Sequence, residues 1–314
     1  MFEKVGLFEN NKPIKVAIIG YGNIAKVHCK ILNKFGAKIN AVSCSTFESG
    51  INASEDIYKL FGYKPNVSID IDEIITKYRP DCVFICTPPE RHFNDIIDTL
   101  KHKVPIFCEK PLIWSKNSKK LKIENDLNTI KLFKDRKIFC NHANNNLLES
   151  LIKKALIKDE IKKFKFLFHT NGIFQNRDIG VDLLPHGIAM ITSLLGDRYK
   201  IQNYFEKIEK NKFVCNFKFN NVEVSFDFAQ SDSLKKKFQI QLNNRNFIRK
   251  DCEKKGAYKV WFIENENNHT YSMDNPFEIE VSKFLKFIKK DTIQRDNFIN
   301  AFHNTKILCD ILLN

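Results

Sequence analysis

The sequence predicts an α/β protein of two domains, and three observations carry this prediction. Over the first third of the chain, short apolar runs alternate with segments of helical periodicity, a pattern typical of a doubly wound parallel sheet. A glycine-rich turn directly follows the first apolar run. Farther along, strand-like segments alternate apolar and polar residues, which indicates an α+β domain with an open, mainly antiparallel sheet. We expect the domains to span residues 1–117 and 118–314.

The first domain opens with a buried strand over Lys15–Gly20, which is followed by a helix over Ile24–Phe35 that ends at Gly36. A second buried strand follows over Ile39–Cys44. We then expect a short helix Ser54–Phe61, a short strand Val67–Ile69, a helix Ile71–Tyr78, a strand Asp81–Cys86, a helix Glu90–Lys101 and a strand Pro105–Cys108. Five strands joined by crossover helices make up this domain.

The alternation of strand-like and helix-like segments ends after Pro111, where the second domain is expected to begin. Helices over Ser118–Phe133 and Leu147–Lys158 flank a short strand near Ile138–Cys140. Half-buried strands are expected at Phe164–His169, Asn211–Phe219, Val222–Ala229, Lys237–Leu242 and Tyr258–Ile263, with a hairpin turn at Asn220–Asn221. The remaining helices are Leu183–Leu195, which ends at Gly196, then Pro276–Lys289 and Asp296–Leu313.

Composition limits the class of protein. A length of 314 residues suits two domains of about 150 residues each. The hydrophobic content of 43%, with 11 Gly and 9 Pro, excludes collagen-like and disordered chains. The net charge of +14 favours an anionic partner such as a phosphorylated small molecule. Because the basic residues are dispersed and no zinc-finger, RNP-like or basic-zipper pattern occurs, we expect no nucleic-acid binding.

Location and metal content follow from similar observations. No apolar run approaches the ~20 residues of a membrane span, and the polar N-terminus lacks a signal-peptide core, so we expect a cytoplasmic protein without membrane contact. The nine cysteines are scattered and form no CxxC pair, which indicates buried, reduced thiols. No spacing of His, Cys, Asp and Glu suggests a metal site.

The turn Gly20-Tyr21-Gly22-Asn23-Ile24-Ala25 predicts a dinucleotide site. Gly20 permits the tight turn, Gly22 lets the backbone approach a pyrophosphate, and the small Ala25 lets the helix pack on the sheet. The amides of Asn23, Ile24 and Ala25 at the helix start would bind the phosphates.

The end of the second strand bears on the choice of cofactor. An NAD site usually has an acidic residue there for the ribose hydroxyls, whereas this chain has Cys44-Ser45-Thr46. Without a carboxylate to repel a 2′-phosphate, Ser45 and Thr46 favour NADP over NAD, although no Arg is placed to bind that phosphate. Either cofactor stays open.

The motifs taken together resemble the Gfo/Idh/MocA family of oxidoreductases. The resemblance lies in Val16–Ala25, in Asp81–Cys108 with its Thr87-Pro88-Pro89-Glu90-Arg91-His92 turn, in Glu109-Lys110-Pro111, and in Asp182–His186 before a helix. It implies an N-terminal Rossmann domain and a C-terminal α/β domain whose open sheet often forms homodimers or homotetramers. It also implies NAD(P)-dependent chemistry on a carbon of a sugar, cyclitol or nucleotide-sugar.

The resemblance implies that Lys110, Asp182 and His186 are catalytic. The chain departs from the family pattern at Leu184, where a Gly is usual, and at Ala189, where an Asp is usual. The segment Asn141–Asn146 departs from it as well, which affects the expected substrate contacts more than the chemistry.

Hydride transfer from an alcohol needs a group that accepts the hydroxyl proton and a group that stabilises the developing alkoxide. Asp182 and His186 are four residues apart and would share a helix face. In the first turn of a helix, His186 would stay neutral as a base, Lys110 would stabilise the alkoxide, and Asp182 would orient its partner. The structural alternatives are an N-cap for Asp182, a hydrogen-bonded first-turn residue for His186, and a strand exit for Lys110.

Further residues are candidates for binding. Thr87 and Pro88 would line the nicotinamide or ribose pocket, and His92 would either face a ligand or cap its helix. The residues expected to bind the cofactor are Gly20, Gly22, Asn23, Ile24, Ala25, Ser45, Thr46, Thr87, Pro88, His92, Glu109 and Lys110; those expected to bind the substrate are Lys110, His142, Asn144, Asp182 and His186. We expect His28, His102, His269 and His303 to be ordinary surface or helix residues.

The sequence thus predicts an NAD(P)-dependent dehydrogenase or reductase that acts on a secondary alcohol or ketone of a sugar-like substrate, with a nucleotide-sugar as the first choice. Two alternatives stay open. One is a sensor that binds the dinucleotide without catalysis, and the other is an imine or tetrapyrrole reductase on the same fold.

Overall fold

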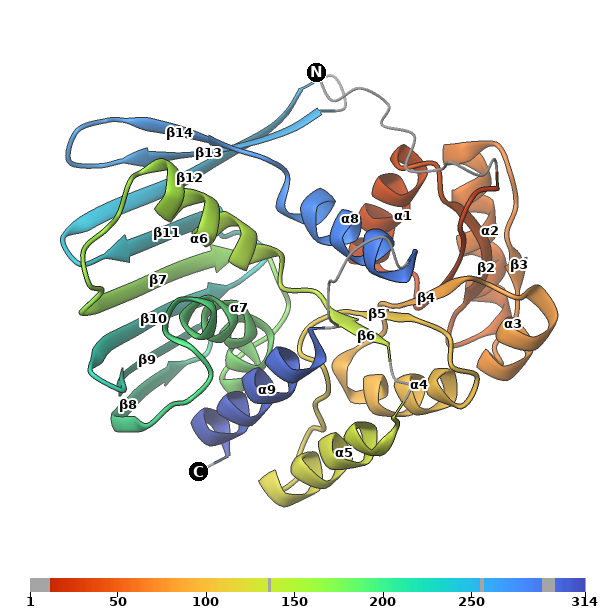
Figure 1. Ribbon diagram of the computed structural model, residues 1–314, viewed down its shortest axis with the longest axis horizontal. Helices are drawn as coiled ribbons and strands as arrows, with labels where there is room; N and C mark the ends of the chain where they lie inside the picture. The colour runs from red at the N-terminus through yellow and green to blue at the C-terminus, as the bar shows by residue number, and fades with distance from the viewer. Residues whose placement is uncertain (1–11, 135–136, 255–256, 290–296, 314) are drawn as a thin grey trace. The chain divides into compact units, whose positions relative to one another are not determined.

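The computed structural model describes residues 12–134, 137–254, 257–289 and 297–313 and divides the chain into two compact units. The first unit comprises the chain up to Asn141 together with Glu280–Ile299. The second comprises His142–Ile279 together with the chain from Asn300 onward. Figure 1 shows the elements of both units.

The first unit is built on a parallel sheet of six strands in the order β3-β2-β1-β4-β5-β6. Except for the edge strand β3, its strands are short, mostly apolar runs that are buried on both faces, as in a sheet covered by helices. They are β1 Lys15–Ile19, β2 Lys38–Ser43, β3 Asn66–Val67, β4 Cys82–Ile85, β5 Ile106–Cys108 and β6 Ile138–Cys140. This confirms the predicted doubly wound sheet.

The helices of this unit connect its strands, and the sequence marks their ends. Thr46 caps the start of α2 with its side chain, and Gly62 with φ +78° ends that helix. The predicted helix Ser54–Phe61 was therefore too short. The helices are α1 Asn23–Lys34, α2 Phe47–Phe61, α3 Ile71–Tyr78, α4 Pro89–Lys101 and α5 Lys120–Leu132. The helix α8, Pro276–Ile288, also belongs to this unit from Glu280 onward.

The first unit extends beyond the predicted limit at residue 117. The strand β6 was expected within the second domain, but it pairs in parallel with β5, from Ile106 opposite Ile138 to Cys108 opposite Cys140. This pairing gives the sheet six strands instead of five and brings α5 and β6 into the first unit. The apolar run predicted the strand but not its partner.

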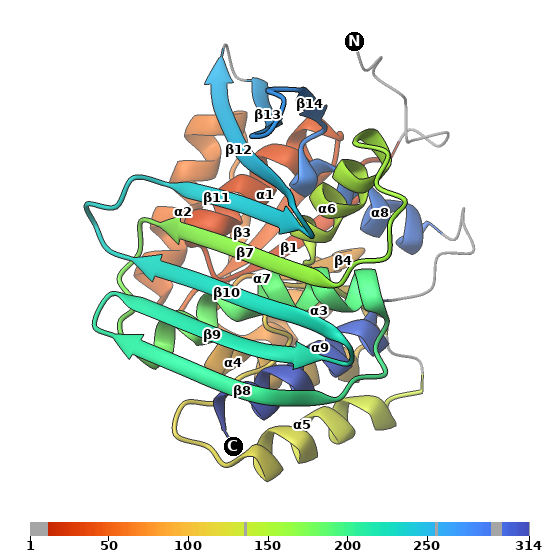
Figure 2. The same cartoon turned by 90° about the vertical axis from the view of Figure 1, so that its left-hand side faces the viewer.

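The second unit contains a mixed sheet of eight strands in the order β14-β13-β12-β11-β7-β10-β9-β8, and Figure 2 looks onto it. Its strand pairs are antiparallel except for β7 and β10, which run parallel. The predicted hairpin turn joins β9 to β10, where Asn220 has φ +55°. The strands are β7 Lys163–Thr170, β8 Ile201–Glu209, β9 Lys212–Phe219, β10 Val222–Gln230, β11 Lys237–Leu242, β12 Arg245–Lys254, β13 Ala257–Glu264 and β14 Thr270–Met273.

The sequence did not predict β8, β12 and β14. The strands β8 and β14 lie at the two edges of the sheet and are largely exposed, so they show no regular apolar alternation. The strand β12 lies inside the sheet, but its sequence Arg245–Lys254 is rich in charged residues, a pattern more typical of a loop.

Three helices cover one face of this sheet: α6 Ala143–Lys154, α7 Arg177–Leu195 and α9 Phe298–Leu312 (Figure 1). The core beneath them is rich in phenylalanine, and the side chains of Phe164, Phe166, Phe213, Phe226 and Phe228 are almost completely buried. The helix predicted at Leu147–Lys158 is α6 and begins four residues earlier. The predicted start of the last helix, Asp296, lies outside the described residues.

The helix α7 is long and apolar enough to be considered as a membrane span. Its mean hydropathy is 1.2, and 56% of the apolar window is buried within the protein. Burial of this kind is typical of the core helix of a globular protein. Of the cysteines, seven are buried as expected, Cys44 is half-buried and Cys252 is exposed.

Candidate cofactor and catalytic sites

The glycine-rich turn between β1 and α1 has the geometry that a dinucleotide requires. Gly20 has φ +83°, and its N–H donates to the carbonyl oxygen of Ser43 at 2.8 Å. A Cβ at Gly20 would lie 2.8 Å from the backbone nitrogen of Thr87, so no side chain fits between the two loops. The turn is thereby held at the carboxyl edge of the sheet, where ligands of such sheets bind.

The start of α1 leaves space for phosphate groups. Gly22 is the N-cap and is exposed, and a Cβ there would meet no described atom within 4 Å. The fully described first turn of α1 holds no acidic residue that would repel an anion. Asn23 is exposed, Ile24 is half-buried, and Ala25 is fully buried against the sheet. These residues fit a pyrophosphate.

The end of β2 offers uncharged side chains. Cys44 is half-buried, while Ser45 and Thr46 are exposed. Thr46 Oγ1 accepts the Ser49 N–H at 3.1 Å, and Ser49 Oγ donates to the Thr46 carbonyl oxygen at 2.9 Å. The Thr46 hydroxyl is thus engaged in capping α2, and Ser45 is the better candidate for a contact with the ribose.

An open cavity of about 570 Å³ lies between the start of α3 and the helix α4. Asp70, Asp72, Asp95 and Asp98 line it, together with Arg91. The excess of carboxylates makes it unsuitable for phosphate groups, in contrast to the start of α1.

A buried pair of a carboxylate and an imidazole includes Glu109, the residue directly before Lys110. Glu109 Oε1 is 2.6 Å from His28 Nε2 of α1 and 2.7 Å from Asn141 Nδ2, and only 6% of Glu109 is exposed. Burial opposes ionisation, but the hydrogen bond and charge of His28 prevail with help from Asn141 and Lys110, and the pKa of Glu109 falls to about 2. Glu109 therefore serves as a buried support and has little exposed surface for the expected cofactor contact.

His28, expected to be an ordinary surface or helix residue, lies in the helix α1 but on its buried face. His28 has no exposed surface, and its ring packs on Phe84 and Phe107 with centroid distances of 5.6 and 5.1 Å. Its spacing from Ala25 and Leu32 on the buried face of α1 is the signal that could have located it.

His92 holds together the loops that follow β4 and β5. It is fully buried, with Nδ1 2.9 Å from the Pro111 carbonyl oxygen and Nε2 2.8 Å from that of Thr87. It neither caps α4, whose N-cap is Pro88, nor has surface for the expected contact with a cofactor. Asp95 accepts the Thr87 hydroxyl at 2.6 Å. The half-buried Thr87 and the exposed Pro88 remain candidates for the cofactor pocket.

Lys110 follows β5 at the same carboxyl edge of the sheet as Gly20. Its side chain is half-buried, a cis peptide bond joins it to Pro111, and its N–H donates to Glu109 Oε2 at 3.3 Å. The first unit thus places a cation at the edge that carries the nucleotide turn.

The helix that carries Asp182 and His186 begins earlier than expected. Its first residue is Arg177 and its N-cap is Asn176, so Asp182 is not an N-cap and His186 lies well beyond the first turn. The argument that the helix dipole keeps His186 neutral was therefore wrong, because that effect is confined to the ends of a helix. The expected start at Leu183 treated Pro185 as a first-turn proline, whereas α7 carries it inside.

Asp182 and His186 nevertheless share one helix face. Both are half-buried, while Leu183, Leu184 and Pro185 between them are buried. Asp182 Oδ2 accepts a hydrogen bond of 2.5 Å from Gln230 Nε2, a residue that the sequence analysis did not consider. The ring of His186 lies 5.8 Å from that of Phe168.

His142 and Asn144, which were expected to bind the substrate, lie at the start of α6. β6 ends at Cys140, His142 is the N-cap of α6 with its Nε2 3.3 Å from Asn304 Nδ2, and Asn144 lies buried in the helix. Both belong to the second unit with Asp182 and His186, whereas Lys110 belongs to the first. Among the residues that the structure describes, no group of three or more His, Cys, Asp or Glu could hold a metal.

Comparison with known proteins finds a family that resembles the part of the chain with the glycine-rich turn. Residues 14–123 match the Gfo/Idh/MocA model, described as an oxidoreductase family with an NAD-binding Rossmann fold. The matched residues all lie within the first unit. The uncharacterized oxidoreductase YrbE of Bacillus subtilis (strain 168) is 30% identical over 105 residues, which cover 33% of this chain and only 29% of that protein.

Solved structures of dehydrogenases and reductases match almost the whole chain, at identities that establish the fold alone. UDP-N-acetylglucosamine 3-dehydrogenase GnnA from Acidithiobacillus ferrooxidans gives a TM-score of 0.72 at 11% identity over 96% of this chain and 97% of its own. Myo-inositol dehydrogenase from Lactobacillus casei, solved with NAD(H) and myo-inositol, gives a TM-score of 0.71 at 16% identity. The match covers 96% of this chain and 93% of that one. A 3-ketoreductase variant from Actinomadura kijaniata, solved with TDP-benzene and NADP, gives a TM-score of 0.71 at 12% identity. The match covers 96% of this chain and 97% of that one.

The resemblance and the fold class predicted from the sequence are thus confirmed. The first unit, which contains the residues that match this oxidoreductase family, has a Rossmann-like sheet.

Proposed function

We propose that this Gfo/Idh/MocA protein transfers a hydride to or from a secondary alcohol or ketone carbon of a sugar-like substrate, with a nucleotide-sugar as the first choice. The observation that supports this most is the placement of Lys110 on the same sheet edge as the Gly20–Ala25 turn. The names of two fold relatives include a nucleotide-sugar and a TDP ligand, and the net charge of +14 suits an anionic substrate.

The roles of the residues follow from charge and hydrogen bonding. A bound nicotinamide would supply or accept the hydride. Lys110 stabilises the negative charge that develops on the substrate oxygen, because it carries a cation at the sheet edge that also holds the Gly20–Ala25 turn. His186 accepts the hydroxyl proton in the oxidative direction, and Asp182 orients His186.

The first experiment is a fluorescence titration of the purified protein with NADH and with NADPH. We expect binding of both and tighter binding of NADPH, because the segment Cys44–Thr46 directly after β2 has no carboxylate to repel a 2′-phosphate. Well-folded protein that binds neither cofactor would refute the dehydrogenase proposal.

A second experiment tests the reaction itself with UDP-N-acetylglucosamine and myo-inositol as probes and the preferred oxidised cofactor. We expect Lys110→Ala and His186→Ala to lose turnover while cofactor binding survives. Full turnover in both variants would refute these roles. Cofactor binding without turnover on sugar alcohols, ketones or imines would instead indicate a sensor.

The cytosolic location and the assembly into a homodimer or homotetramer belong to the same proposal. Light scattering on the purified chain checks the assembly, and a monomeric mass would refute it.

A further inference from the structure

We propose that Gln230 is a positioning residue, which keeps the carboxylate of Asp182 ionised and fixed in orientation. This inference rests on the proposed function, because Asp182 has a role only if the second unit takes part in the reaction. Gln230 is the last residue of β10 and lies opposite Thr170, the last residue of β7. The two strands run parallel, so their ends meet at one edge of the sheet.

The contact with Asp182 is specific in its chemistry. Gln230 is 2% exposed, and its Nε2 donates to Asp182 Oδ2 at 2.5 Å. An amide has a donor at one end and an acceptor at the other, so only the NH₂ end can face an ionised carboxylate. A hydrogen bond to a charged acceptor is roughly twice as strong as one between neutral groups, and it stabilises the ionised form.

The carbonyl end of the Gln230 amide shows that the contact with Asp182 has a cost in stability. Gln230 Oε1 is buried and has no hydrogen-bond partner among the described residues. An unsatisfied buried acceptor costs about 1–3 kcal/mol, and an apolar side chain of the same shape would avoid that cost. Local packing therefore does not explain a glutamine at this position, whereas orientation of Asp182 does.

Gly172 holds the amide in place from the loop after β7. A Cβ at Gly172 would lie 2.6 Å from Gln230 Oε1 and 2.7 Å from its Cδ, so the loop backbone packs directly against the amide. Any larger residue at position 172 would displace the amide from Asp182. Because Asp182 and His186 share a helix face, a fixed carboxylate also restricts the orientation available to His186.

The test is NMR of the full-length protein labelled with ¹³Cγ-aspartate, in which Asp182 is assigned from its absence in Asp182→Asn. We expect the titration midpoint of Asp182 to move to higher pH in Gln230→Met, which retains the shape but loses the donor. Gly172→Ala should shift it in the same direction, because it displaces an intact Gln230. Gln241→Met is the control, since that glutamine of β11 donates to the Asn243 carbonyl oxygen instead.

An unchanged midpoint in both Gln230→Met and Gly172→Ala would overturn the inference. Turnover separates this result from failure of the proposed function. If Asp182→Asn retains full kcat on a probe that the protein turns over, the catalytic role of Asp182 is refuted. If Asp182→Asn lowers kcat, we expect Gln230→Met to lower kcat by about 10- to 100-fold with little change in KM. A decrease of this size corresponds to the loss of one hydrogen bond to a charged group.

Discussion

At the scale of single residues, the buried pair of Glu109 and His28 gives a sharp prediction. We expect Glu109→Gln to lower the free energy of unfolding at pH 7 by about 3–5 kcal/mol, because it leaves His28 buried without its charged partner. The measurement is urea unfolding. Glu55→Gln is the control, since its partner Lys64 lies on the surface and such pairs contribute about 1 kcal/mol or less.

The pH dependence of this effect has a definite sign. The pKa of Glu109 lies at about 2 in the folded protein and near its usual value when unfolded. The stabilisation is therefore complete above the unfolded pKa and is lost as the pH falls toward 2. A difference between wild type and Glu109→Gln that stayed constant from pH 7 to pH 3 would contradict the pairing.

Gly20 gives a second prediction at this scale. Gly20→Ala introduces a Cβ 2.8 Å from the Thr87 nitrogen at a positive φ, so we expect the Kd for NADPH to rise at least about tenfold. Gly62→Ala has a similar φ but open space around its Cβ, so it isolates the cost of the backbone conformation. An equal effect of both substitutions on NADPH binding would argue against contact between the two loops.

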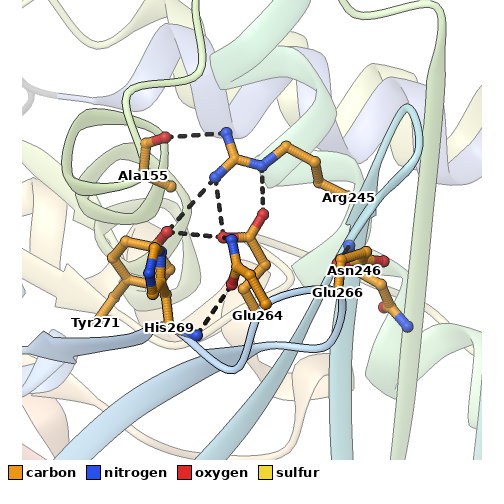
Figure 3. Close-up of polar contacts among 8 residues, drawn as sticks. Ala155, Arg245, Asn246, Glu264, Glu266, His269 and Tyr271 are labelled. Carbon is orange, nitrogen blue, oxygen red and sulfur yellow. Dashed lines mark hydrogen bonds and ion pairs between the residues drawn. The ribbon is translucent and has the colours of Figure 1, made fainter.

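At the scale of elements, Arg245 joins the edge of the second sheet to a helix (Figure 3). Its Nε is 2.5 Å from Glu264 Oε1, one of its terminal nitrogens donates to the Ala155 carbonyl oxygen at 2.9 Å, and the Tyr271 hydroxyl donates to Glu264 Oε2 at 2.8 Å. The cluster links the start of β12, the end of β13, the edge strand β14 and the end of α6. The bond from Arg245 lowers the pKa of Glu264 to about 2.

We expect Arg245→Lys to loosen the edge strand, because lysine cannot form the two-pronged bond to Glu264. Hydrogen exchange followed by mass spectrometry should show faster exchange over β14, Thr270–Met273. The exposed Arg198 provides the control variant Arg198→Lys. Unchanged exchange in Arg245→Lys would show that strand pairing alone holds β14.

Sequence patterns predicted elements well where burial is regular and poorly where charge or tertiary pairing decides. The apolar runs of β1, β4 and β5 and the Asn220 turn were visible in the sequence because each satisfies a local rule. The start of α7 was not, because Pro185 looks like a helix start and is tolerated inside. Gln230 and His28 were missed because their partners, Asp182 and Glu109, are 48 and 81 residues away.

At the scale of the whole molecule, the first unit depends on a segment from near the end of the chain. Phe284 of α8 is fully buried, with its ring 5.5 Å from Phe84, 5.4 Å from Phe107 and 5.9 Å from Phe139. We expect Phe284→Ala to lower the free energy of unfolding by about 3–5 kcal/mol, as measured in urea. Phe205→Ala is the control, since 60% of Phe205 is exposed, and an equal effect of both would refute the core role of Phe284.

The division of the first unit between two stretches of the chain also has a consequence for biosynthesis. A nascent chain that has reached Ile279 contains the whole central stretch of the second unit but still lacks Phe284. The nucleotide turn has left the ribosome long before the aromatic cluster beneath its sheet can close. Completion of the first unit therefore has to wait until the whole central stretch of the second unit has been translated.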